Sequence, residues 1–156
     1  MKNLISTIDH FVIKVCRKLS LPFGRLALFV VYFWFGILKI IGRGYTNPLI
    51  ENLMEQTLPF MTFSSFIIGF SIYEVIIGIL FLIPKWTRLA IFLLLPHIII
   101  MVFPLFLIPE VMWEANFIPT LEGQYIIKNL LVIALAISLA ARLTPLRYSV
   151  LRIPDE

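Results

Sequence analysis

Residues 63–84 read FSSFIIGFSIYEVIIGILFLIP and contain a single charged residue, Glu74. The run matches the about 20 residues that an α-helix needs to cross about 30 Å of hydrocarbon. We therefore predict a transmembrane helix over this stretch. Its one carboxylate lies near the middle of the span, where hydrocarbon disfavours a charge most strongly.

Three further apolar runs of similar length accompany this one, so the predicted spans are about 21–42, 63–84, 87–109 and 122–141. The composition agrees, since 60% of the 156 residues are hydrophobic and 14% are charged, against about 45–50% and about 25% in soluble domains. This excludes a disordered chain, a coiled coil and an ordinary soluble enzyme. The sequence predicts an all-α, polytopic membrane protein, with a four-transmembrane-helix bundle in residues 21–145 and a cytoplasmic tail over 146–156.

Residues 1–20 form a separate predicted unit with apolar side chains at helical spacing. These are Leu4, Ile5, Ile8, Phe11, Val12, Val15 and Leu19. The polar and charged residues of this segment, including His10, lie mostly on the other side. We predict an amphipathic helix in the membrane interface, with a docking helix for a partner as the alternative.

Local signals mark the connections between the spans. The short segment 84–88 predicts a tight antiparallel hairpin between the second and third spans. Asn47 followed by Pro48 is typical of a helix start, and Thr120 is placed to cap the fourth span. Pro96 is expected to perturb the third span just before His97.

The basic residues are distributed unevenly between the two sides of the predicted bundle. With the N-terminus inside, 10 of the 13 lysines and arginines lie on the inner side, and the others are Lys39, Arg43 and Lys128. The positive-inside rule then predicts that both termini are cytoplasmic. The net charge of +4 is not clustered, so we expect no nucleic-acid partner.

Three charged residues fall inside predicted spans at similar depth, which differs by only about 5 Å at the helical rise. They are Lys39, Glu74 and Lys128, and we predict that they form a polar cluster in the outer half of the bundle, with Tyr32 and His97 nearby. Two lysines and one glutamate leave a net positive charge, which suits an anion or a carbonyl that gains negative charge during reduction. The alternative is an ion-pair network that only holds the helices together.

Several kinds of site are not expected. The single cysteine, Cys16, cannot form an internal disulfide, a CxxC redox pair or a zinc site. The sequence also lacks the dinucleotide-binding, P-loop, nucleophile-elbow and zinc-protease motifs. A haem held by two histidines is not expected either, since His10 lies outside the bundle. We therefore predict no metal site and no intrinsic cofactor.

Five short segments carry a resemblance to a known family. They are Arg25-Leu26 with FWFGILK at 33–39, Asn47-Pro48-Leu49, EVIIG at 74–78, Pro109-Glu110 with Trp113, and GQYIIKN at 123–129. Their order and spacing resemble the DoxX-like superfamily, and most closely its YkgB/RclC type. The resemblance implies a four-helix inner-membrane bundle whose recurring positions are Arg25, Gly36, Lys39, Glu74, Gly78, Gly123 and Lys128.

The functions within that superfamily differ. Its members include a membrane subunit linked to thiosulfate:quinone oxidoreduction, proteins tied to oxidative or reactive-chlorine stress, and an animal receptor-assembly chaperone. The resemblance therefore implies a quinone-type small-molecule binding or redox-associated membrane subunit, whereas a non-enzymatic assembly or chaperone factor is the alternative. A small transporter or proton pathway through Glu74 and His97 is a third hypothesis. The expected partners are the lipid bilayer and a redox or membrane protein, with a second copy of the chain as a further candidate.

Overall fold

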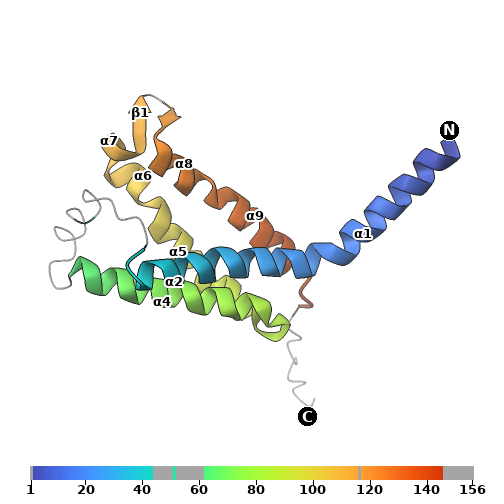
Figure 1. Cartoon of the computed structure of the whole chain (residues 1–156), viewed down its shortest axis with the longest axis horizontal. Coiled ribbons are helices and arrows are strands. Elements are labelled where there is room, and N and C mark those ends of the chain that lie inside the picture. The colour runs from blue at the N-terminus through green and yellow to red at the C-terminus, as the bar shows by residue number, and fades with distance from the viewer. Residues whose placement is uncertain (1, 44–50, 52–61, 116, 146–156) are drawn as a thin grey trace, which may run out of the picture.

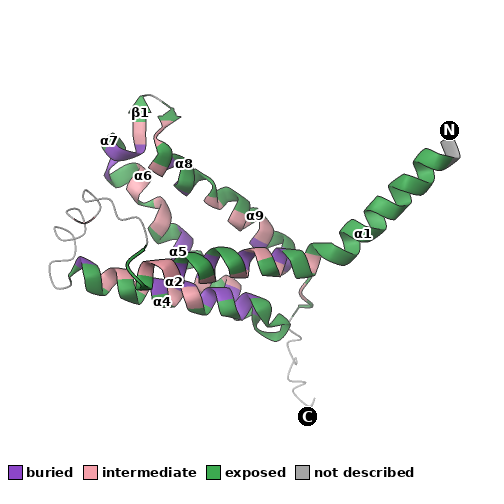
Figure 2. Cartoon of the chain, viewed as in Figure 1, coloured by how far each residue is buried: buried purple, intermediate pink, exposed green. Residues whose placement is uncertain are grey.

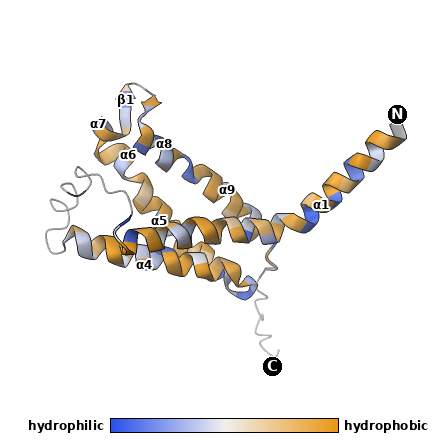
Figure 3. Ribbon diagram, in the orientation of Figure 1, coloured by the Kyte–Doolittle hydropathy of each residue, from blue (hydrophilic) through white to orange (hydrophobic). Residues whose placement is uncertain are grey.

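The computed structural model describes residues 2–43, 51, 62–115 and 117–145 (Figure 1). Within these residues, four helical stretches are long and apolar enough to cross a membrane: Leu4–Ile40, Phe63–Leu82, Pro84–Leu107 and Leu121–Ala140. Figure 3 shows that apolar residues dominate these stretches. The chain is an integral membrane protein with an all-α four-helix bundle, which confirms the predicted fold class. The helix start predicted at Asn47-Pro48 lies outside the described residues.

The first span belongs to a helix that runs without a break from α1 (Lys2–Phe29) through one π-helical turn, η1 (Val30–Trp34), into α2 (Phe35–Ile40). The boundary predicted between residues 20 and 21 is therefore not a break in the helix. Figure 1 shows that the first half of α1 leaves the bundle in a different direction from the packed half. Pro22 lies inside α1, and a proline within a helix removes one backbone hydrogen bond and bends the axis.

The second and third spans form the predicted hairpin. Helix α4 (Phe63–Leu82) is followed by the single turn η2 (Pro84–Trp86) and then by α5 (Thr87–Val102), which contains Pro96. Two short helices continue the chain after α5, α6 (Pro104–Leu107) and α7 (Pro109–Met112). Each of them begins at a proline. Proline suits the first helical position because the backbone N–H that it lacks would have no intrahelical partner there.

A small antiparallel hairpin that the sequence did not predict precedes the fourth span. Strand β1 (Trp113–Ala115) pairs with β2 (Ile118–Pro119), and Phe117 in the turn has a positive φ of 62°. The fourth span consists of α8 (Leu121–Ile127) and α9 (Asn129–Ala140). The side chain of Thr120 accepts a hydrogen bond from the backbone N–H of Gly123 at 3.2 Å, which confirms the predicted cap.

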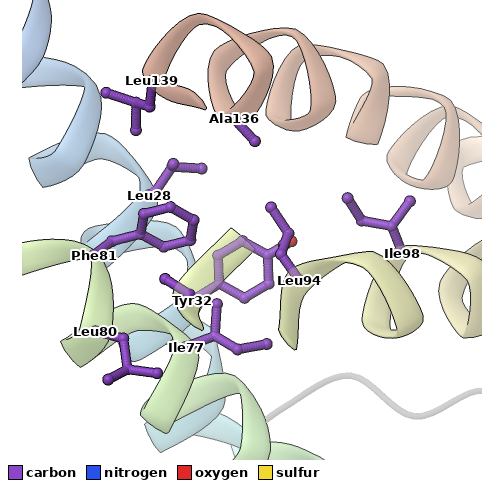
Figure 4. Close-up of a cluster of buried hydrophobic side chains, with 10 residues drawn as sticks. Leu28, Tyr32, Ile77, Leu80, Phe81, Leu94, Ile98, Ala136 and Leu139 are labelled. Carbon is purple, nitrogen blue, oxygen red and sulfur yellow. The ribbon is translucent and has the colours of Figure 1, made fainter. Parts of the chain in front are cut away.

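All four spans contribute side chains to one buried cluster (Figure 4). Its labelled members are Leu28, Tyr32, Ile77, Leu80, Phe81, Leu94, Ile98, Ala136 and Leu139. Burial is confined to the faces where the spans meet, and the opposite faces are exposed (Figure 2). The exposed residues there are apolar, as Phe92 at 70% and Leu131 at 73% exposure show. Such faces suit a lipid environment, where apolar exposure is not penalised.

Two glycines let the first span approach α4 closely. A Cβ at Gly36 would lie 2.9 Å from the carbonyl oxygen of Ser71, and one at Gly78 would lie 2.8 Å from the backbone nitrogen of Phe33. Both contacts are with backbone, which cannot move aside as a flexible side chain can. Small residues of this kind allow transmembrane helices to pack tightly. The close packing brings the site residues of α2 within reach of α4.

Candidate functional site

Three charged or titratable side chains from three different helices meet inside the bundle. Nζ of Lys39 on α2 lies 2.7 Å from each carboxylate oxygen of Glu74 on α4. Nε2 of His97 on α5 lies 3.0 Å from Oε1 of the same carboxylate. We call these three residues the Lys39–Glu74–His97 cluster. Glu74 and His97 are only 4% and 3% exposed, so the cluster is held inside the apolar part of the molecule.

The contacts around Glu74 determine which nitrogen of His97 carries the proton. The Lys39 ammonium donates to both oxygens of a carboxylate, and an ionised carboxylate can only accept. Nε2 of His97 therefore donates its N–H to Oε1. Among the described residues, Nδ1 of His97 is a buried side-chain polar atom with no hydrogen-bond partner. Most buried polar atoms are satisfied, so this nitrogen is the chemically notable atom of the cluster.

Aromatic rings surround the imidazole of His97. Phe70 stacks on its face with ring centroids 4.8 Å apart and an interplanar angle of 14°. Tyr32 meets it edge-on at 5.1 Å, and the ring of Tyr73 lies 6.3 Å away. The Lys39 ammonium is 5.8 Å from the centroid of Phe70, which is within cation–π range. The cluster is thus polar at its centre and enclosed by flat apolar surfaces.

Pro96 and Tyr73 together fix the turn of α5 that carries His97. Pro96 lacks the backbone N–H that would stabilise this turn and its ring crowds the preceding turn. The hydroxyl of Tyr73 on α4 donates to the carbonyl oxygen of Leu93 in the same part of α5, at 2.5 Å. The N–H that Pro96 lacks would have bonded to the carbonyl of Phe92, so the contact of Tyr73 is a separate one, which ties α4 to the carbonyl four residues before His97. Tyr73 is therefore a positioning residue for His97.

Lys128 does not belong to the cluster, which corrects the prediction that three charges meet. The residue is exposed, and its ammonium lies 4.9 Å from the ring centroid of Tyr125. In the described part of the chain, the ionic partners of Glu74 are Lys39 and His97. The depth of Lys128 along the helix says nothing about its rotation, and the residue lies exposed at the junction of α8 and α9.

The expected net charge of the site changes as a result. With Lys128 elsewhere, the charges of Lys39 and Glu74 cancel, and the predicted net positive site does not form. What remains is a neutral, hydrogen-bonding cluster with one free nitrogen. Such a site suits an uncharged polar ligand better than an anion.

The other predicted positions have structural surroundings. Nη1 of Arg25 donates to the hydroxyl of Thr87 at 2.5 Å and to the carbonyl of Phe81 at 3.5 Å, at the end of the bundle opposite to the cluster. Gly36 and Gly78 pack against backbone as described above, and Gly123 packs against the backbone of Met112. Within the residues that the structure describes, no group of three His, Cys, Asp or Glu side chains could hold a metal ion.

Sequence reasoning named Lys39, Glu74, His97 and Tyr32, and the structure brings these four together. It named neither Phe70 nor Tyr73, which also lie against the imidazole of His97. A usable signal existed for Phe70, because it lies four residues before Glu74 and therefore on the same face of α4.

Comparison with known proteins finds no matching family model, no similar curated protein and no similar solved structure. The resemblance to the DoxX-like superfamily therefore stays a prediction. The candidate site rests on its geometry alone.

Proposed function

We propose that this protein is a membrane subunit that binds a quinone-type small molecule at the Lys39–Glu74–His97 cluster and works with a redox partner. The observation that carries the proposal is Nδ1 of His97, a buried polar atom to which no residue in the described part of the chain hydrogen-bonds, beside a buried ion pair. Polar and ionisable groups inside a membrane are costly and are commonly functional. A ring with an oxygen substituent can supply the missing hydrogen bond.

The chemistry of the cluster suits this class of ligand. A quinone-type head group is planar, uncharged and carries oxygens at its rim, which matches a neutral polar centre enclosed by the rings of Tyr32 and Phe70. Glu74 holds the imidazole through Nε2, as a carboxylate orients the base in a catalytic dyad. Since the sequence contains no nucleotide-binding motif, the redox partner supplies or takes the electrons.

The first test is a titration of the purified protein in detergent with decylubiquinol under anaerobic conditions. The His97→Phe variant keeps a flat ring but removes both nitrogens, and we expect at least about tenfold weaker binding from the loss of a hydrogen bond to a buried group. The matched control is His10→Phe, because His10 is exposed on the projecting half of α1. Its affinity should equal that of the wild type. Absence of binding to the wild type, or equal binding to all three proteins, would contradict the proposal.

The proposed location is the inner membrane of a bacterium with both termini cytoplasmic, which the distribution of lysine and arginine supports. Cys16 is the only cysteine and is exposed, so it reports on sidedness directly. A membrane-impermeant maleimide should leave Cys16 unlabelled in intact spheroplasts and label it after permeabilisation. As a control, Glu114→Cys in a Cys16→Ser background should be labelled in both preparations, because exposed Glu114 lies on the outer hairpin. Labelling of Cys16 in intact spheroplasts would reverse the topology.

A second candidate function, the assembly of another membrane protein, is favoured by the projecting half of α1. Residues 4–20 are all exposed, including large apolar side chains such as Ile5 at 67% and Phe11 at 66% (Figure 2). Deletion of residues 2–19 separates the two candidates. A ligand-binding subunit keeps its affinity for decylubiquinol after this deletion, whereas an assembly factor loses its complex with the client protein.

A further inference from the structure

Resting on the proposed function, we propose that the Lys39–Glu74–His97 cluster selects the reduced, hydroxyl-bearing form of its quinone-type ligand, whose O–H donates to Nδ1 of His97. The inference follows from which atoms of the cluster carry a proton and which can only accept a hydrogen bond. It deepens the proposed function because it states which redox form binds and through which atom.

The charge of the cluster decides the state of His97. Lys39 and Glu74 form a bidentate ion pair with both N–O distances at 2.7 Å, so their charges cancel. A protonated imidazole would add an uncompensated positive charge to a residue that is 3% exposed. A charge of this kind is costly in an apolar medium. His97 is therefore neutral, with its single proton on Nε2 facing Glu74.

A neutral imidazole with its proton on Nε2 has a lone pair on Nδ1 and can only accept a hydrogen bond there. A quinol hydroxyl is a donor and satisfies this atom. A quinone carbonyl is itself an acceptor and would place two lone pairs against each other. The buried nitrogen thus discriminates between the two redox forms of the same ring, since a buried acceptor left unpaired weakens binding.

The position of the cluster allows a ligand to reach it. The side chain of Lys39 keeps 23% exposure, so the cluster borders the surface of the bundle. Phe70 is half-buried and stacks on the imidazole. Phe70 covers the face of the imidazole, whereas the Nδ1 lone pair lies in the plane of the ring, so a ligand hydroxyl has to approach His97 at the edge of the ring, with Phe70 left in the stack.

The decisive experiment compares three ligands on the wild-type protein: decylubiquinol, decylubiquinone and the dimethyl ether of the quinol. The ether keeps the shape of the quinol but has no O–H to donate. We expect the quinol to bind at least about tenfold more tightly than the other two, as loss of one buried hydrogen bond predicts. The His97→Phe variant should bind all three alike. His10→Phe should retain the preference of the wild type.

The outcomes separate the inference from the proposed function. Equal affinity of the wild type for quinol and quinone overturns the selection of the reduced form but leaves a quinone-type site in place. Failure of all three ligands to bind overturns the proposed function itself. Because the comparison of ligands uses the wild type, it does not depend on whether the His97→Phe variant folds.

A second measurement tests the proton assignment without a ligand. The chain contains only two histidines, His10 and His97, so protein labelled with nitrogen-15 histidine contains just two imidazoles. At neutral pH, the spectrum should show a protonated Nε2 and an unprotonated Nδ1 for His97, and the His10→Phe variant assigns the signals. A proton on Nδ1 in the free protein would overturn the inference.

Discussion

Replacing Glu74 with leucine is expected to lower the free energy of unfolding by about 3 kcal/mol, the lower end of the cost of breaking a buried ion pair by removing one partner. The substitution leaves the Lys39 ammonium without its carboxylate and the Nε2 N–H of His97 without its acceptor. The lower end applies because the side chain of Lys39 is 23% exposed and can reach polar surroundings. Unfolding by a denaturing detergent, followed by circular dichroism, measures the change.

A double variant tests the cause of this loss. Lys39→Met combined with Glu74→Leu removes both charges, and replacement of a whole buried ion pair by apolar residues is often neutral or stabilising. The double variant should therefore be more stable than Glu74→Leu alone. Glu110→Leu, at an exposed carboxylate in the short helix α7, serves as the control and should change stability by less than about 0.5 kcal/mol. If the double and single variants are equally unstable, the unpaired Lys39 charge is not the source of the loss.

Replacing Gly78 with alanine is expected to destabilise the bundle by about 1–3 kcal/mol, as overpacking does elsewhere. The new Cβ would lie 2.8 Å from the backbone nitrogen of Phe33 and 3.2 Å from the carbonyl oxygen of Phe29. Backbone atoms cannot rotate away, so α4 must move from the first span. That movement also stretches the contact between Lys39 and Glu74. Binding of decylubiquinol should therefore weaken together with stability.

The same helix provides the control for this experiment. A Cβ at Gly69 would meet nothing within 4 Å, so Gly69→Ala adds a methyl group to α4 without a clash. Alanine is the better helix former by up to about 1 kcal/mol, and this variant should be as stable as the wild type or slightly more so. Equal loss of stability in both variants would show that the effect of Gly78→Ala does not come from the close approach of the two helices.

The spans were predictable because hydropathy and length are properties of each segment alone. Residues 63–84 contain one charge, and a helix is the structure that satisfies every backbone group of such a segment in lipid. The meeting of Lys39 with Glu74 was predictable for a similar reason, since helical rise gives the depth of each residue. Their depths matched, and two opposite charges in hydrocarbon are less costly when they pair than when each stays alone.

Rotation about the helix axis was not predictable in the same way. Lys128 matched the depth of the cluster, but on the fourth span it lies exposed, over the ring of Tyr125, and no count along the sequence gives the rotation of that helix. The β1–β2 hairpin was missed because its strands are only three and two residues long, too short for an alternating pattern. The continuity of α1 was missed because the amphipathic pattern of residues 1–20 gives way to an apolar run, although one helix can continue through such a change and bend at a proline.

The π-helical turn η1 lets the first span hold one extra residue in a single turn. A π-helical turn holds one residue more than an α-helical turn, since each N–H bonds to the carbonyl five residues back. In a regular α-helix, each residue added or removed rotates everything beyond it by about 100°, and a π-helical turn takes up one such residue locally. Loss of one residue from Val30–Trp34 would therefore let the turn close as a regular α-turn, with Arg25 still on Thr87 and Lys39 still facing Glu74. This turn is thus the place in the first span where a single-codon deletion would leave the cluster assembled, whereas the same deletion in the α-helical part between Arg25 and Lys39 would rotate the two residues apart.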